Sequence, residues 1–472
     1  MYIQQLYTGC LSEAAYYIES NGEAAIVDPL RDIEAYLLLA KERGTTIKYI
    51  FETHFHADFV SGHLDLASST GATIIYGPQT ETSYKVKVAT DNEIFKLGNI
   101  RIKVLHTPGH TLESSCFLVL DENGKEHAVF TGDTLFIGDV GRPDLSSGNL
   151  DSNTLAGMLY HSLNDNIKTL PDDVIAYPAH GAGSACGKNL STETTSTIGQ
   201  QKATNYALQQ DNPEAFVAAV TTGLNAAPSY FSVNAEINKK GYKPLNEIIE
   251  SAGNPIGIDA VKYLIKHKGN DTLIVDTRHS DLFAEGFIPT SISIGLNGRF
   301  AEWAGELLEF DKDIVLVTDA DKLEESTVRL ARVGFERIAG HVEGGFDAWR
   351  DAGESTDMII NIEADELAMD LPHDDKLLVV DVRNNNEFDE KHVVGAYHAP
   401  LNGLNKVENI AMIPDEANLY VHCAGGYRSI IAASLIKKQG IHNVRNIVGG
   451  FKSISAEDRI PLETSKKTAI AE

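Results

Sequence analysis

Short apolar runs, each followed by small and polar residues, recur along the first part of the chain. The run 47–51 is typical of a buried strand, and a helical pattern begins again near residue 61. Further strands are predicted within 1–30 and at 73–76, 100–105, 116–120 and 128–130, with a leucine-bearing amphipathic helix over 32–43. Strands interspersed with helices in this way indicate an αββα sandwich.

The pattern becomes helical and polar between about 193 and 250. Pro213, Pro228 and Pro244 are expected to break these helices, because proline lacks the backbone N–H that a helix interior needs. We interpret this stretch as the closing helices of a first domain, followed by a linker.

An internal repeat occupies the remainder of the chain. Leu273-Ile274-Val275-Asp276-Thr277-Arg278 corresponds to Leu378-Val379-Val380-Asp381-Val382-Arg383, and Glu343-Gly344-Gly345-Phe346 corresponds to Val448-Gly449-Gly450-Phe451. Both pairs are 105 positions apart, and each copy has one further apolar strand between them, at 314–317 and 419–422. The sequence therefore predicts an α/β multidomain protein with domains at 1–245, 246–356 and 357–472.

Composition limits the possible functions. A chain of 472 residues with 43% apolar residues can bury several cores, and its formal charge of −27 argues against a nucleic-acid partner. The N-terminus lacks a basic and apolar leader, and no run is long enough to span a membrane, so we expect a cytoplasmic protein. Four cysteines are too few for a disulfide framework, and reduced thiols are expected.

Four of the polar clusters carry imidazole or carboxylate groups where a strand ends. The first, Thr53-His54-Phe55-His56-Ala57-Asp58-Phe59, places two imidazoles and a carboxylate within five positions. The others are Thr107-Pro108-Gly109-His110, Thr131-Gly132-Asp133 and Tyr177-Pro178-Ala179-His180. A single histidine in a loop is usually an ordinary surface residue, but four such clusters in order predict a metal site.

A cysteine in the second repeat copy is the best candidate for a reactive thiol. Cys423 begins the loop Cys423-Ala424-Gly425-Gly426-Tyr427-Arg428, between a strand and a helix. Backbone N–H groups at a helix start stabilise a thiolate. Gly425 and Gly426 let the backbone bend around the sulfur and a substrate, and Arg428 adds positive charge or binds an anionic acceptor. In the first copy, we match this loop to residues 319–324, where acidic residues replace the thiol, and we expect that copy to be catalytically inactive.

Together with Ala25-Ile26-Val27-Asp28-Pro29, the four metal clusters resemble those of the metallo-β-lactamase superfamily, in its glyoxalase II and persulfide dioxygenase branch, over residues 1–240. Dinuclear zinc hydrolases of this superfamily use His-x-His-x-Asp-His, and this chain has Phe59 at the last position. The resemblance to persulfide dioxygenases implies one Fe(II) per chain, held by His54, His110 and Asp133. It also implies that His56, Asp58 and His180 surround these ligands and orient them. The same donors also accept zinc.

Two further features bear on the substrate. Gly141-Arg142-Pro143-Asp144 resembles a family element in which Arg142 shapes or neutralises the pocket, although an ordinary turn gives the same pattern. Cys186 follows His180 in a glycine-rich stretch that we expect to be flexible, so its thiol is a candidate for accepting or presenting sulfur. Cys10 is a weaker candidate, and Cys116 is expected to be structural.

The repeat copies resemble successive rhodanese domains, and the whole chain resembles CstB-type persulfide dioxygenase-sulfurtransferases of bacterial sulfide detoxification. This resemblance implies oxidation of a low-molecular-weight persulfide or polysulfide by O₂ to sulfite. Cys423 would then transfer sulfane sulfur to sulfite, giving thiosulfate. It also implies a homo-oligomer with no membrane partner. Two alternatives stay open: a zinc thioester hydrolase of the glyoxalase II kind with an accessory sulfurtransferase, and a sulfur-carrier scaffold whose first domain only binds. The sequence does not identify the thiol carrier.

Overall fold

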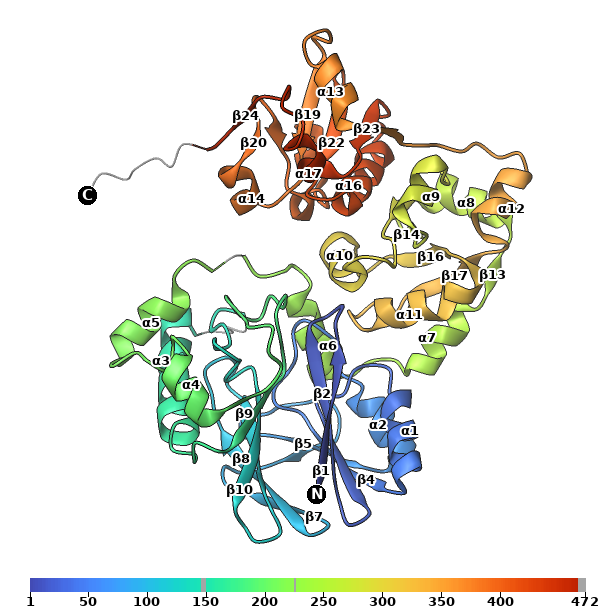
Figure 1. The fold of residues 1–472 in the computed structure, drawn as a ribbon. Helices are drawn as coiled ribbons and strands as arrows, with labels where there is room; N and C mark the ends of the chain where they lie inside the picture. Colours follow the sequence, from blue (N-terminus) through green and yellow to red (C-terminus); the bar gives the residue numbers. More distant parts are fainter. Residues whose placement is uncertain (146–149, 225, 466–472) are drawn as a thin grey trace. The chain divides into compact units, whose positions relative to one another are not determined.

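A computed structural model of the protein describes residues 1–145, 150–224 and 226–465. Residues 466–472 of the third predicted domain lie outside the described residues. The chain forms two compact units, Met1–Glu247 with Leu330–Glu336, and Ile248–Arg329 with Arg337–Glu472 (Figure 1).

The first unit contains two six-stranded sheets. One has the order β1 (Tyr2–Thr8), β2 (Glu13–Ser20), β3 (Glu23–Val27), β4 (Thr46–Phe51), β5 (Thr73–Tyr76), β6 (Lys87–Val88). The other has the order β12 (Ser196–Thr197), β11 (Ile175–Pro178), β10 (Glu126–Gly132), β9 (Ser115–Leu120), β8 (Ile100–His106), β7 (Ile94–Leu97). Its helices are α1 (Glu34–Arg43), α2 (His63–Thr70), α3 (Ser152–Ser162), the π-helix η1 (Leu163–Ile167), α4 (Ile198–Thr204), α5 (Pro213–Thr221) and α6 (Phe231–Lys240).

Alternation along the strands creates the layers of this unit. Tyr16 of β2 packs in the core between the two sheets, whereas Tyr17, its neighbour in sequence, packs on the opposite face with residues of α1 and α2. A third core joins the outer face of the second sheet to α3, α4 and α5. The predicted αββα sandwich is therefore confirmed, with both faces of each sheet buried.

The three prolines near the end of this unit lie between helices or at the start of one, so the prediction that they interrupt the helical stretch is confirmed. Pro213 is the first residue of α5, and the side chain of Asn212 accepts a hydrogen bond from the backbone N–H of Ala215. Proline is favoured at the first helical position because the N–H it lacks has no partner there. Pro244 directly precedes α7 (Leu245–Ala252).

The second unit contains two parallel five-stranded sheets of the same strand order. The first copy has β13 (Pro255–Ile256), β17 (Ile338–Val342), β16 (Asp313–Val317), β14 (Thr272–Asp276), β15 (Ile292–Ser293); the second has β18 (Ile360–Ile362), β23 (Val444–Ile447), β22 (Asn418–His422), β19 (Leu377–Asp381), β21 (Tyr397–His398). A two-stranded sheet pairs β20 (His392–Val393) with β24 (Leu462–Glu463).

Helices surround both sheets of this unit. In the first copy they are α8 (Ile258–Lys268), α9 (Ser280–Glu285), α10 (Phe300–Leu307), η2 (Ala320–Lys322), α11 (Leu323–Ala331) and α12 (Gly345–Asp351); in the second they are α13 (Ala364–Asp370), α14 (Asn385–Glu390), η3 (Leu401–Gly403), α15 (Val407–Ala411), α16 (Tyr427–Lys438) and α17 (Gly450–Ile454). The shared order confirms the internal repeat. Among the described helices, none combines the length and apolarity needed to cross a lipid bilayer.

Candidate functional site

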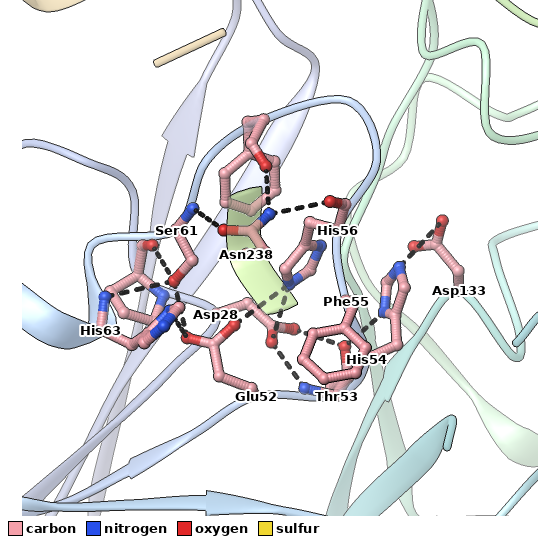
Figure 2. A network of polar contacts seen from close by, with 12 residues as sticks. Asp28, Glu52, Thr53, His54, Phe55, His56, Ser61, His63, Asp133 and Asn238 are labelled. Carbon is pink, nitrogen blue, oxygen red and sulfur yellow. Dashed lines mark hydrogen bonds and ion pairs between the residues drawn. The ribbon is translucent and has the colours of Figure 1, made fainter. Parts of the chain in front are cut away.

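The loop after β4 is held by a carboxylate at the end of β3. Asp28 accepts hydrogen bonds from the backbone N–H of Thr53 at 2.7 Å and from the hydroxyl of Thr53 at 2.9 Å. The same hydroxyl lies 3.0 Å from Nδ1 of His54 (Figure 2). Because the hydroxyl donates to Asp28, it accepts from His54, so Nδ1 carries the proton and the lone pair on Nε2 faces the site.

His54, His110 and Asp133 converge as the sequence predicts. Nε2 of His54 lies 3.8 Å, and Nε2 of His110 lies 3.4 Å, from Oδ2 of Asp133. Nδ1 of His110 donates to the carbonyl oxygen of Arg142 at 2.8 Å, which fixes the same tautomer as in His54. The ligand atoms of these three residues all lie within 4.8 Å of one another.

These residues fit a metal ion. Both carboxylate oxygens of Asp133 are buried and receive no hydrogen bond from any residue that the structure describes. Burial, with the neighbouring imidazoles, holds the pKa of His54 well below its usual value, so this ring is neutral and free to coordinate. Two imidazoles facing an uncompensated carboxylate form a cation site.

His180 and Asp58 lie beside this set. Nε2 of His180 is 3.4 Å from Oδ2 of Asp58 and 3.5 Å from Oδ1 of Asp133. Nδ1 of His180 contacts the carbonyl oxygen of Ser12 at 3.2 Å. The second oxygen of Asp133 therefore faces a neighbouring pair of possible donors.

His56 faces a different carboxylate group. Its Nε2 lies 3.0 Å from Asp28 and 3.6 Å from Glu52. Burial opposes protonation, but these carboxylates outweigh it and raise the pKa of His56 to about 10. Phe59 is fully buried, and its ring centre lies 4.3 Å from that of His56. An apolar ring therefore occupies the position of the missing histidine.

Cys186 lies at the metal site. Its sulfur belongs to a group with Asp133 and His180 whose ligand atoms lie within 4.8 Å of one another. Burial, with the nearby carboxylates, raises the pKa of this thiol. The backbone N–H groups of Lys188 and Asn189 each donate to Asp139 at 2.6 Å, so this loop is anchored, contrary to the flexibility expected from its glycines.

Arg142 supports that loop. Its guanidinium pairs with Asp144 at 2.8 Å and donates to the carbonyl oxygen of Ala185 at 3.3 Å. The backbone N–H of Arg142 donates to the carbonyl oxygen of Cys186 at 3.1 Å. Its charge is offset by Asp144, and these contacts tie the segment that contains Arg142 to the loop that carries Cys186.

Sequence reasoning missed several residues that hold the metal loop. Asn238 of α6 donates to the carbonyl oxygens of His56 and Phe59, both at 2.8 Å, and accepts from the backbone N–H of Ser61 at 2.9 Å. Ser61 in turn donates to Glu52 at 2.6 Å (Figure 2). Neither Asn238 nor Glu52 belongs to a recognisable motif, and nothing in the sequence pattern indicates that α6 reaches this loop.

The predicted thiol loop lies between β22 and α16. The backbone N–H of Gly426 donates to the sulfur of Cys423 at 3.1 Å, and Ser429 lies 3.6 Å from that sulfur. Gly426 has a φ of 110°, which favours glycine. A Cβ atom added at Gly425 or Gly426 would meet nothing within 4 Å, so the space beside this part of the loop is open.

Arg428 forms a two-point ion pair with Glu387, with both contacts at 2.7 Å. Its charge is therefore offset within the protein, rather than standing free for an anionic acceptor as predicted.

The equivalent position in the first copy is Thr318, so the match to residues 319–324 is wrong by one residue. Asp276 pairs with Val317 as Asp381 pairs with His422, and the next residues are Thr318 and Cys423. A hydroxyl therefore replaces the thiol. The repeat offset gives the same equivalence, because Thr318 and Cys423 are 105 positions apart.

Comparisons with known proteins agree with this architecture. A model of the metallo-beta-lactamase superfamily matches residues 8–180, and a model of the rhodanese-like domain matches residues 260–352 and 363–457. A probable hydroxyacylglutathione hydrolase from Schizosaccharomyces pombe is 31% identical over 234 residues, which cover 44% of this chain and 87% of that protein.

Two solved structures are similar to this chain. The crystal structure of a metallo-beta-lactamase from Staphylococcus aureus is 34% identical with a TM-score of 0.63, and the match covers 73% of this chain and 99% of that one. The structure of ETHE1 from Myxococcus xanthus is 27% identical with a TM-score of 0.44, and the match covers 51% of this chain and 98% of that one.

Proposed function

Because the chain belongs to the metallo-β-lactamase superfamily and continues into two rhodanese-like domains, we propose that it is a persulfide dioxygenase with sulfurtransferase activity, of the CstB type. The first unit would oxidise the outer sulfur of a low-molecular-weight persulfide, and the second would transfer sulfane sulfur to the sulfite formed. The observation that carries this proposal is a site of His54, His110 and Asp133, with Phe59 at the second-ion position, in one chain with the Cys423 loop.

A single ion accounts best for the donors at the site. Phe59 offers no ligand atom, and His56 faces Asp28 at 3.0 Å. Two imidazoles and one carboxylate leave coordination positions for a substrate and O₂, the arrangement associated with non-haem Fe(II). Fe(II) held there would bind the persulfide sulfur and activate O₂.

The residues around the triad would orient the reactants. Asp133 and His110 are each 2% exposed, so little water reaches the site. Cys186 presents a thiol beside Asp133, where it is placed to hold or exchange the terminal sulfur. The overall reaction balances as R–S–SH plus O₂ plus water giving R–SH, sulfite and two protons.

Cys423 would carry sulfur in the second reaction. Its persulfide passes the outer sulfur to sulfite, the sulfur–sulfur bond breaks, and the electron pair stays on the Cys423 sulfur as thiosulfate leaves. The Gly426 N–H, 3.1 Å from this sulfur, would stabilise the resulting thiolate. The second reaction therefore uses the sulfite that the first reaction forms.

The relative from S. pombe supports a second candidate, a zinc-dependent thioester hydrolase with an accessory sulfurtransferase. Anaerobic purification with metal quantitation, followed by O₂ uptake on glutathione or coenzyme A persulfide and a parallel thioester assay, separates the two. We expect about one iron per chain and O₂ uptake with sulfite formation. Zinc with thioester cleavage and no O₂ uptake would exclude the dioxygenase.

A sulfur-carrier scaffold is tested in the same assays. His110→Ala removes a triad ligand and should abolish persulfide oxidation. An unchanged flux of sulfur to the acceptor in that variant would mean that the first unit only binds.

A further inference from the structure

The sulfur-carrier loop is held at both ends by its own domain. At its start, the backbone N–H of Phe451 donates to the carbonyl oxygen of Cys423 at 2.6 Å, and at its end Arg428 pairs with Glu387 at 2.7 Å. Between these points Ala424 and Gly425 are exposed, and a Cβ atom added at Gly425 or Gly426 would meet nothing within 4 Å. Tyr427, next to this exposed stretch, is supported from outside the domain.

The first rhodanese-like copy, which lies in the same compact unit, supplies this support. The hydroxyl of Tyr427 donates to the carbonyl oxygen of Gly295 at 2.7 Å. The ring lies against Gly298, where an added Cβ would overlap its atoms. Tyr427 thus contacts the 295–298 backbone with both its hydroxyl and its ring.

The 295–298 backbone is itself held from within the first copy. The guanidinium of Arg329 donates to the carbonyl oxygens of Leu296 at 2.6 Å and Gly298 at 3.4 Å. The backbone N–H of Leu296 donates to the carbonyl oxygen of Thr277, just after β14, at 3.1 Å. This segment therefore presents a fixed surface to Tyr427.

We propose that the first copy is a positioning element for the sulfur-carrier loop: its 295–298 backbone holds Tyr427, and Tyr427 keeps the adjoining Gly426 N–H on the sulfur of Cys423. This inference rests on the proposed role of Cys423 as sulfur carrier. It assigns a function to a copy that has Thr318 in place of the thiol. Tyr427, Gly295 and Gly298 are positioning residues in this arrangement.

A matched control exists on the same helix. The side chain of Ser434 accepts a hydrogen bond from the backbone N–H of Ser293 at 3.0 Å, so it also joins α16 to the first copy, but two turns away from the loop. Ser434→Ala should weaken the contact between the copies without moving the sulfur. A merely structural contact predicts that the Ser434 and Tyr427 variants behave alike.

The test measures two rates at Cys423 in the full-length protein: alkylation by iodoacetamide, followed by mass spectrometry, and sulfur loading from thiosulfate. Tyr427→Phe should slow both by about fivefold, the effect of one lost hydrogen bond. Gly298→Ala should slow them by about tenfold or more, since small displacements of a reactive group are costly. Ser434→Ala should keep wild-type rates and only lower the melting temperature.

A double variant shows whether Gly298 acts through the ring. In a Tyr427→Ala background, Gly298→Ala should cost nothing further, because the overlapping ring is gone. Additive losses, wild-type rates in Tyr427→Phe, or equal losses in Ser434→Ala would overturn the inference. Alkylation does not depend on sulfur transfer. Slowed alkylation with no sulfur loading in the wild type would therefore refute the proposed function and leave the positioning role standing.

Discussion

Each imidazole at the metal site has one nitrogen bonded within the protein and the other facing Asp133. His54 uses the Thr53 hydroxyl, while His110 and His180 use backbone carbonyl oxygens. This arrangement fixes the tautomers before any ion binds, which lowers the cost of assembling the site. The ligand atoms of His56, Asp58 and His180 lie within 4.8 Å of one another, but Nε2 of His56 faces Asp28 at 3.0 Å, and Phe59 replaces the last histidine donor of the dinuclear enzymes.

Replacing Phe59 with histidine should supply that donor. Nε2 of His180 already lies 3.4 Å from Oδ2 of Asp58 and 3.5 Å from Oδ1, the second oxygen, of Asp133. Phe59→His should therefore raise zinc binding from about one to about two ions per chain, measured by elemental analysis after reconstitution. Phe55→His adds an imidazole to the same loop and should leave the count unchanged. Two ions in the wild type would contradict the single-ion interpretation.

His63 makes the first unit sensitive to acid. Burial, with the charge of Arg31, lowers the pKa of His63 from 6.5 to about 3. The folded protein therefore keeps this ring neutral while the unfolded chain takes up a proton. Its contribution to the free energy of unfolding is complete above pH 6.5 and is lost as the pH falls toward 3, by at most about 1.4 kcal/mol per pH unit.

Hydrogen exchange of α2 at pH 7.5 and pH 5.0 measures this effect. The ring of His63 stacks on Tyr84, with ring centres 5.2 Å apart, so His63→Phe keeps an aromatic ring and removes the titration. In His63→Phe, the protection of the α2 amides against exchange should fall less between pH 7.5 and pH 5.0 than it does in the wild type. An equal fall in both proteins would refute the assignment to His63.

At the scale of elements, the residues that begin α14 both stabilise that helix and contact the sulfur-carrier loop. Asn384 caps α14 by accepting a hydrogen bond from the backbone N–H of Glu387 at 3.0 Å, and Glu387 bonds back to the N–H of Asn384 at 3.1 Å. The same Glu387 pairs with Arg428 at 2.7 Å. One capping box therefore also orients the partner of an arginine in the loop.

Asn384→Ala should cost about 1 kcal/mol, the usual effect of losing such a cap. For a unit of this size, the melting temperature should fall by about 2–4 °C. Circular dichroism of the full chain measures this fall, because Trp303 and Trp349 both lie in the first copy and their fluorescence would not follow α14. Asn385→Ala, at an exposed neighbouring position, is the control. Equal losses in both variants would contradict the capping role.

The sequence predicted the elements better than their ends and faces. Apolar runs such as 47–51 gave the strands, since both sides of each sheet are buried. Helix α1 packs through the buried side chains of Tyr36 and Ala40, whereas Leu38 is 56% exposed. The position of the sheet, and not the run of leucines, decides which face of the helix is buried. The 105-residue repeat offset already places Thr318 opposite Cys423, whereas Asn238 stayed hidden because a distant side-chain contact leaves no local pattern.

For the whole molecule, the two centres should be separable by substitution. Cys423→Ser removes the sulfur carrier but leaves the metal site of the other unit intact. Persulfide turnover should then consume O₂ at the wild-type rate and accumulate sulfite in place of thiosulfate, measured by derivatisation and chromatography. Thr318→Val changes the equivalent position of the first copy and should still yield thiosulfate. Thiosulfate from Cys423→Ser would show that sulfur reaches sulfite by another route.

The metal donors come from both sheets of the sandwich. His54 follows β4 in one sheet, whereas His110 and Asp133 follow β8 and β10 in the other. An ion held by all three fastens the sheets together at their common rim, so its binding and the closure of the sandwich are thermodynamically linked. Removal of the ion should therefore both abolish activity and make the first unit more susceptible to proteolysis.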